Sequence, residues 1–203
     1  YAPPTGAPAP VAPQTLASNP LQVPLPDAEQ WQALLQHYGP VLAVADTQSW
    51  NTPGRVQLDD THRPVINTQQ PVSYSWPSWT HFRGQNLLQL NYQFWFSQRP
   101  KSGWLDSYAG TLDGLIWRVT LKANGEVLFY AGNVADARDQ RLALLLEPDT
   151  HYLVRVTAVD DSLPTTAYQL ADADDLRALP APDGSVDSLF NANGLVPDRK
   201  SVV

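Results

Sequence analysis

The feature that most constrains the fold is the strict alternation of side chains in LLQLNYQFWF, residues 87–96. Successive side chains of an extended strand point to opposite faces of a sheet. One face of this segment is apolar and consists of Leu88, Leu90, Tyr92, Phe94 and Phe96. The other face carries Gln89, Asn91, Gln93 and Trp95. The pattern predicts a long strand with one face turned to a core.

The segment LDGLIWRVTLKANGEVLFY, residues 112–130, predicts a hairpin. Asn124-Gly125 favours a two-residue type I′ turn, which would place Leu121 opposite Leu128 and Val119 opposite Tyr130. We therefore expect these four apolar residues to pack inward. Arg118 belongs to the opposite face, and Asp113 is expected to serve the turn at Gly114 or to pair with a nearby arginine.

DAEQWQALLQHYG, residues 27–39, predicts an amphipathic helix. Asp27 is the expected N-cap, with Gln30 completing a capping box. The apolar stripe at helical spacing is Trp31, Leu34, Leu35 and Tyr38.

Further strands are expected in VLAVA (41–45), TPGRVQL (52–58), QPVSYSW (70–76), RLALLL (141–146) and HYLVRVTAV (151–159). Pro71 cannot donate to a ladder, so residues 70–76 are predicted as an edge strand. Short helices are expected in ADADDLRAL (171–179) and VDSLFNANG (186–194). The fold class is therefore mainly β (α+β). We expect an antiparallel sandwich or barrel-like sheet with one N-terminal amphipathic helix and short C-terminal helices.

Residues 1–25 are rich in proline and alanine and predict a linker, followed by a single mainly-β domain over 26–203 with a polar segment from about residue 160. Residues 1 to about 24 are expected to contribute nothing to the core. The linker fits a domain held away from a lost N-terminal membrane anchor, as in a lipoprotein. It fits a plain disordered tail equally well.

The chain is acidic, with a net charge of −7 and a pI of about 4.8. This charge argues against binding to nucleic acid, and no apolar run is long enough for a transmembrane segment. The absence of cysteine excludes disulfides and thiolate chemistry.

Candidate chemistry is sparse. The four histidines have no short metal-ligand spacing, and the chain lacks a nucleophile elbow, a phosphate-binding loop and a calcium loop. We expect no metal and no cofactor. The weak catalytic candidates are His81, Asp113, Arg118 and His151.

Tryptophan is abundant, with 7 residues, and SWPSW places Trp76 and Trp79 three residues apart. Exposed aromatic faces beside amides and arginines stack on sugar rings or peptides. Trp76, Trp79 and Arg83 are therefore the candidate ligand-binding residues. The alternative is that the tryptophans fill the core and the space between sheets.

Four segments, HYGPVLAVADTQSWNTPGRV, LLQLNYQFWFSQRP, LDGLIWRVTLKANGEVLFY and THYLVRV, resemble an uncharacterised family of mainly proteobacterial cell-envelope proteins. The similarity covers roughly residues 38–159. It implies one compact domain on the periplasmic side of the bacterial envelope and carries no assigned activity. Members of the family follow the hairpin with a segment of the form CGCYH, where this chain reads YAGNVADARDQ. His151 is the one potential ligand that resembles a family position.

Two functional hypotheses follow. The first, which we favour, is a non-catalytic binding or structural module of the envelope with a protein or glycan partner. The second is a hydrolase-like enzyme with a site around His81, Asp113, Arg118 and His151. The two are distinguished by whether any two of His62, His81 and His151 lie within about 4–5 Å of each other or of a carboxylate in one concave pocket.

Overall fold

A computed structural model of the chain describes residues 1–3, 16–45, 48–101, 104, 109–130, 141–159 and 166–179. Its helices are α1 (Ala28–Tyr38), the 3₁₀ turn η1 (Ser49–Asn51) and α2 (Asp174–Arg177). Its strands are β1 (Val41–Val44), β2 (Arg55–Leu58), β3 (Pro64–Asn67), β4 (Val72–Phe82), β5 (Gln85–Phe96), β6 (Asp113–Leu121), β7 (Val127–Tyr130), β8 (Leu142–Leu146), β9 (Leu153–Ala158) and β10 (Gln169–Asp172).

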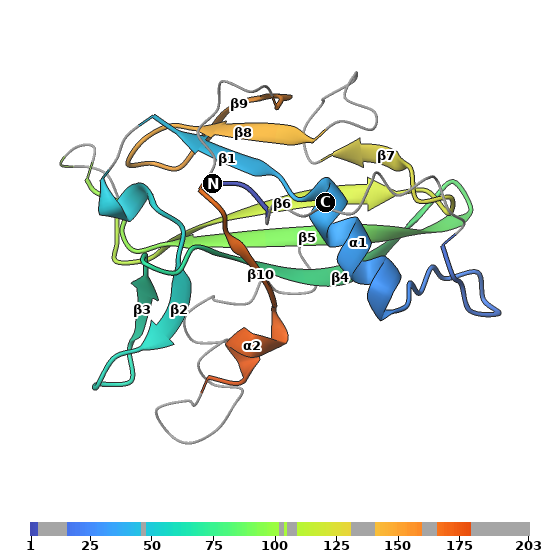
Figure 1. Ribbon diagram of the computed structural model, residues 1–203, viewed down its shortest axis with the longest axis horizontal. Helices are drawn as coiled ribbons and strands as arrows, with labels where there is room; N and C mark the ends of the chain where they lie inside the picture. Colours follow the sequence, from blue (N-terminus) through green and yellow to red (C-terminus); the bar gives the residue numbers. More distant parts are fainter. Residues whose placement is uncertain are drawn as a thin grey trace.

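The described strands form three sheets (Figure 1). The large sheet has the order β10-β4-β5-β6-β7, a smaller sheet has the order β1-β8-β9, and β2 pairs with β3. The mainly-β class, the N-terminal helix and a short C-terminal helix are confirmed, and the sheet does not close into a barrel. The second expected C-terminal helix, residues 186–194, lies outside the described residues.

Pairing in the sheets is mixed, so the expectation of antiparallel pairing alone is wrong. β1 pairs with β8 and β10 pairs with β4 in parallel, whereas β4-β5-β6-β7 is antiparallel throughout. Parallel neighbours require long connections along the chain, and both of these pairs join segments far apart in the sequence. Local periodicity carries no signal for such pairings.

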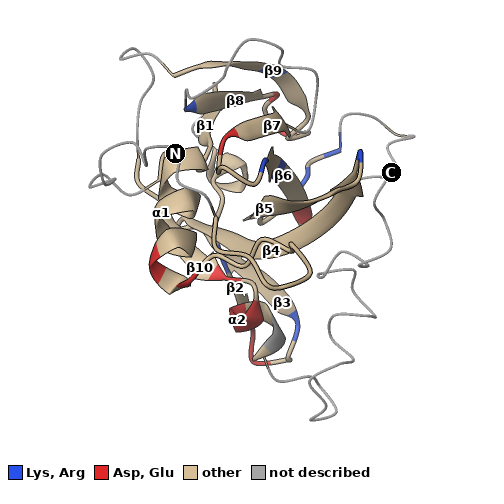
Figure 2. Ribbon diagram, turned by 90° about the vertical axis from the view of Figure 1, so that its right-hand side faces the viewer, with Lys and Arg blue, Asp and Glu red and all other residues tan. Residues whose placement is uncertain are grey.

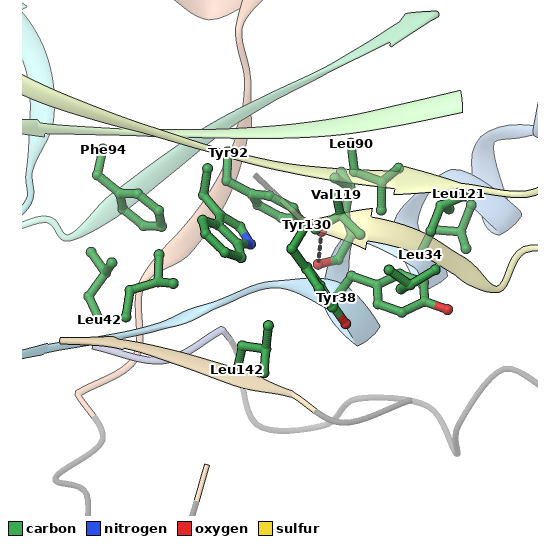
Figure 3. Packing of buried hydrophobic residues seen from close by; sticks show 14 of the residues in the cluster. Leu34, Tyr38, Leu42, Leu90, Tyr92, Phe94, Val119, Leu121, Tyr130 and Leu142 are labelled. Carbon is green, nitrogen blue, oxygen red and sulfur yellow. Dashed lines mark hydrogen bonds between the residues drawn. The ribbon is translucent and has the colours of Figure 1, made fainter. Parts of the chain in front are cut away.

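The main core lies between the apolar face of the large sheet, the smaller sheet and α1. Figure 3 shows Leu90, Tyr92 and Phe94 of β5 facing Leu42 of β1 and Leu142 of β8. The five apolar residues that alternate along β5 are all essentially inaccessible to solvent. The predicted inward face of this strand is therefore confirmed.

Helix α1 begins at the expected N-cap, because the Gln30 backbone N–H donates to the Asp27 side chain at 2.8 Å. The Gln30 side chain does not complete the predicted capping box, since its Oε1 has no hydrogen-bond partner among the described residues. Leu34, Leu35 and Tyr38 are buried and Trp31 is half-buried. Burial of the Tyr92 hydroxyl, which donates to the Leu35 carbonyl oxygen at 3.0 Å, raises the pKa of that tyrosine well above its ordinary value. The helix is thus fixed to the sheet by apolar packing and by a buried hydrogen bond.

The β6–β7 hairpin differs in register from the prediction. Val119 faces Tyr130 as expected, but Leu121 faces Val127 across a bulge. Gly125 has φ of 82°, whereas Asn124 is not among the residues with positive φ, so the turn is not type I′. The Lys122 N–H donates to the Glu126 carbonyl oxygen at 2.8 Å. The chain therefore forms a three-residue loop with a bulge, and Val127 replaces Leu128 as the buried residue.

β4 is not an edge strand where it was predicted to be one. β10 pairs with it in parallel over residues 72–75. Pro71 precedes the strand, so its missing N–H removes no ladder bond, and its carbonyl oxygen accepts from the Gln169 N–H at 2.8 Å. Pro77 lies beyond the end of β10, where the outer side of β4 needs no donor.

The described residues before α1 contribute to the core, as Leu16 and Ala2 show. Leu16 is 5% exposed and belongs to the main core, and Ala2 is 6% exposed. The Leu16 N–H donates to the Ala123 carbonyl oxygen at 2.9 Å. The Ala2 N–H donates to the Thr166 carbonyl oxygen. The expectation that these residues add nothing to the core is wrong, because hydrogen bonds to distant loops hold them there.

Candidate functional site

Asp113, His151 and Asn51 form a polar cluster at one end of the apolar face of the large sheet. Asp113 starts β6 opposite Phe96 of β5, and the His151 ring stacks on the Phe96 ring at 3.9 Å between centroids. His151 Nδ1 lies 2.7 Å from Asp113 Oδ2, and His151 Nε2 lies 3.1 Å from Asn51 Oδ1. Asn51 arrives there because Pro53, two residues on, forms a bridge with Phe96.

Both ring nitrogens of His151 face oxygen acceptors. Asn51 Oδ1 also accepts the Asp149 backbone N–H at 2.8 Å, which fixes the orientation of the amide, since the flipped amide would set donor against donor. Both nitrogens of the ring are thus engaged by neighbouring side chains. Neither ring nitrogen is therefore directed at a nucleophile.

Asp149 and His151 have φ of 68° and 54°, in the left-handed region that costs a non-glycine residue energy. Asp149 is held by Trp50, whose indole N–H donates to its carboxylate at 2.7 Å. His151 is 4% exposed and Asn51 is 1% exposed. The cluster therefore joins the β8–β9 turn, η1 and β6, and its geometry is that of a structural connection.

The other catalytic candidates lie elsewhere. His81 is exposed near the end of β4, with its Nδ1 3.1 Å from Asn86 Oδ1. Arg118 projects from the opposite face of β6, as predicted, and its Nε donates to Asn91 Oδ1 at 2.7 Å. The structure thus brings together Asp113 and His151 and separates them from His81 and Arg118.

The second polar cluster is on the face of the large sheet that points away from the main core. We call it the amide face and define it by Trp76, Ser78, Gln89, Asn91, Gln93, Ile116, Arg118 and Thr120 of strands β4, β5 and β6. Gln89, Asn91, Gln93 and Thr120 are each less than 5% exposed. A row of buried amides is uncommon, because each polar group requires a partner.

Hydrogen bonds cross all three strands of the amide face. Gln89 accepts from the Ser78 hydroxyl at 3.0 Å and donates to the Thr120 hydroxyl at 3.2 Å. Asn91 Nδ2 donates to the Trp76 carbonyl oxygen and to the Ser78 hydroxyl, while its Oδ1 accepts from Arg118. Asn91 therefore holds the Arg118 guanidinium in one orientation.

Two side chains of this face have polar groups without a hydrogen-bond partner among the described residues. The Nη1 and Nη2 groups of Arg118 and the side-chain amide of Gln93 make no hydrogen bond to any residue that the structure describes. Gln93 lies opposite Ile116, which directly neighbours the Asn91–Arg118 pair. Residues that lie diagonally across two strands in this way are about 7–8 Å apart. Because Gln93 is only 4% exposed, a ligand on this face would contact mainly Arg118.

The amide face is bounded by aromatic side chains. At one end Tyr74 and Trp95 pack under the β2–β3 hairpin and α2, and burial raises the pKa of the Tyr74 hydroxyl, which accepts the Val56 N–H at 3.0 Å. At the other end Phe82 and Phe129 meet edge to face and are each about half exposed. Trp76 is half-buried and Ile116 is 36% exposed.

Trp76 and Trp79 do not form one aromatic platform. Their separation by three residues on a strand places them on opposite faces of β4. Trp76 belongs to the amide face, whereas Trp79, 43% exposed, donates its indole N–H to the Pro24 carbonyl oxygen. Arg83 occupies the β4–β5 turn, over the Phe82 ring at 5.2 Å.

Sequence reasoning missed Asn51, Asn91 and Gln93 as members of a site. For Asn91 and Gln93 a signal was present, since two glutamines and an asparagine recur at every second position of a long strand. Asn51 lies in a short turn and has no pattern around it. The distance in sequence to His151 gives no reason to connect them.

Within the described ranges, no group of three or more His, Cys, Asp or Glu side chains could hold a metal ion, and none of the helices is long and apolar enough to cross a membrane. No protein-family model, no curated protein sequence and no solved structure matches this chain.

Proposed function

We propose that this chain is a non-catalytic binding module of the bacterial cell envelope, on its periplasmic side, and that its amide face binds a glycan. The observation that carries the proposal is the array of buried amides that crosses three strands and ends at Arg118, Gln93 and Trp76. Sugar hydroxyls both donate and accept hydrogen bonds, and their ring faces stack on aromatic side chains. The envelope location is supported by the resemblance of residues 38–159 to an envelope family.

The hydrolase-like alternative has one observation in its favour, the 2.7 Å contact between Asp113 and His151. A general base needs a free nitrogen directed at a nucleophile, and Nε2 of His151 is engaged by Asn51. His81 and Arg118 lie away from this pair. The binding hypothesis uses Arg118 and Trp76, which are partly exposed, whereas the hydrolase hypothesis uses Asp113 and His151, which contact each other.

The test is a titration of the protein with chitotetraose, cellotetraose and tetragalacturonate, in which NMR records the chemical shifts of the backbone amides. We expect at least one oligosaccharide to change the amide chemical shifts of residues in β4, β5 and β6 around Trp76 and Gln93. Trp76→Ala should abolish the shifts, while Trp79→Ala, on the opposite face of the same strand, should leave them unchanged. The proposal would be overturned by no binding at millimolar concentrations, or by chemical-shift changes confined to the β1-β8-β9 sheet.

A further inference from the structure

The amide face is distinguished by its charge as well as by its amides. Asp113 and Arg118 are the only Asp, Glu, Lys or Arg residues within β4, β5, β6 and β7, and Figure 2 shows β4 and β5 without charged residues along their length. Asp113 points to the core face, because it is opposite Phe96. The amide face itself therefore carries a single charge, the guanidinium of Arg118, on a chain whose net charge is −7.

We infer that the glycan bound by the amide face is acidic and that its carboxylate pairs with Arg118; the inference rests on the proposed function. A guanidinium presents its N–H groups in a planar fork that matches the two oxygens of a carboxylate. Because Nε of Arg118 is engaged by Asn91, the two terminal nitrogens form the end of the fork that remains for the ligand.

The environment of Arg118 strengthens this pairing. The nearby side chains of Gln89, Asn91 and Thr120 are neutral and almost wholly buried, so the effective dielectric constant on this side of the guanidinium is lower than in water. No carboxylate of β4–β7 shares this face to compete for the arginine. Asn91 acts as a positioning residue, since its three hydrogen bonds fix the direction of the Arg118 fork.

Gln93 is a buried polar neighbour of Arg118, with 4% of its surface exposed. Its side-chain amide makes no hydrogen bond to another described residue and lies one diagonal step from Arg118. Because so little of Gln93 is exposed, the polar contacts of a sugar bound here come mainly from the Arg118 guanidinium. Trp76 and Ile116 provide the adjoining apolar surface for the sugar ring.

The experiment compares tetragalacturonate with its methyl ester, the same chain without its negative charges, by calorimetric titration in a buffer that contains EDTA. We expect the acid to bind at least about tenfold more tightly than the ester. We expect this preference to weaken as salt is added. This comparison of two ligands uses the unmodified protein, so it does not depend on the folding of a variant.

Variants then assign the preference to Arg118. Arg118→Gln should remove the preference for the acid, and Arg118→Lys should retain only part of it, because a lysine lacks the fork and the bond to Asn91. Arg155 is an exposed residue of β9, in the β1-β8-β9 sheet. Arg155→Gln makes the same change in net charge and should leave the preference for the acid intact. Thermal unfolding of each variant checks that the fold is retained.

The outcomes separate the two proposals. If acid and ester bind equally, or if Arg118→Gln and Arg155→Gln weaken binding to the same extent, the acidic ligand is wrong and the glycan-binding function stands. If neither tetragalacturonate, its ester nor the neutral oligosaccharides bind, the proposed function fails and the inference fails with it.

Discussion

His151 is the residue at which three distant parts of the chain meet. Its ring stacks on Phe96, and its nitrogens contact Asp113 and Asn51. The backbone at His151 has a φ of 54°, which costs free energy that these contacts must offset. A residue held in this way is expected to contribute strongly to the stability of the fold.

We expect His151→Ala to lower the free energy of unfolding by roughly 2–4 kcal/mol, because it removes the ring that stacks on Phe96 and contacts Asp113 and the buried Asn51. A double-mutant cycle with Asp113→Ala, measured by urea unfolding, should give a coupling energy of about 1–3 kcal/mol. His81→Ala is the matched control, since this exposed histidine has a single side-chain partner, and its effect should stay within about 0.5 kcal/mol. A coupling near zero would show that the cluster is not a structural connection.

Asp59 provides a pH-dependent test at a single turn. The Arg63 backbone N–H and the Thr61 hydroxyl both donate to its carboxylate and hold the pKa of Asp59 below its ordinary value of 3.8. The contribution of this carboxylate to stability is therefore present above the ordinary value and is lost as the pH falls through the lowered one. Carbon-detected NMR titration of Asp59 should report the lowered pKa.

Thr61→Val is the matched variant for this titration. It removes one hydroxyl donor, so the pKa of Asp59 should rise toward its ordinary value while the fold is kept. A pKa of Asp59 that does not change in the variant would contradict the assigned cause.

At the scale of elements, the turn with two left-handed residues does not lie in the hairpin whose sequence most favours it. Arg83 and Gly84 have φ of 50° and 79°, so the β4–β5 turn is the one with two left-handed residues. Asn124-Gly125 has the stronger sequence signal, yet only Gly125 is left-handed. The bulge after Thr120 absorbs the extra loop residue and keeps Tyr130 opposite Val119.

Substitutions at the two turns distinguish these geometries. Arg83→Asn should stabilise the domain by about 0.5–1 kcal/mol, because asparagine tolerates the left-handed region better than arginine. Gly125→Ala should cost about 1–2 kcal/mol, whereas Asn124→Ala should cost less, since it removes only the bond to the Glu126 N–H. Urea unfolding measures all three. Equal losses at positions 124 and 125 would indicate a type I′ turn instead.

At the scale of the whole molecule, the segment before α1 is part of the packed structure at Leu16. This residue belongs to the same cluster as Leu34 of α1, Tyr130 of β7 and Leu142 of β8. The Leu16 backbone N–H is bonded to the β6–β7 loop, which fixes the side chain over the end of the core. Residues that sequence composition assigned to a linker thus help to close the core.

Leu16→Ala should therefore lower the free energy of unfolding by about 2–5 kcal/mol, as for other buried leucines. Leu21→Ala is the matched control in the same segment, because Leu21 is 77% exposed, and it should change stability by less than about 0.5 kcal/mol. Chemical denaturation of the two variants provides the measurement. Equal effects would mean that Leu16 does not pack on the domain in solution.

The sequence by itself determined the local elements of this protein and the faces they bury. The alternation along β5, the stripe of α1 and the Asp27 cap follow from spacings of two to four residues, which the chain geometry converts directly into faces. It also separated Arg118 from the core face, because position on a strand fixes the side to which a side chain points.

Only the tertiary structure decided which distant segments meet. The parallel pairs β1–β8 and β10–β4, the contact of His151 with Asp113 and Asn51, and the burial of Leu16 all join residues with no common local pattern. Such contacts form because the whole core lowers the free energy enough to offset the entropy of closing long loops. That balance belongs to the complete chain, so no short stretch of sequence encodes it.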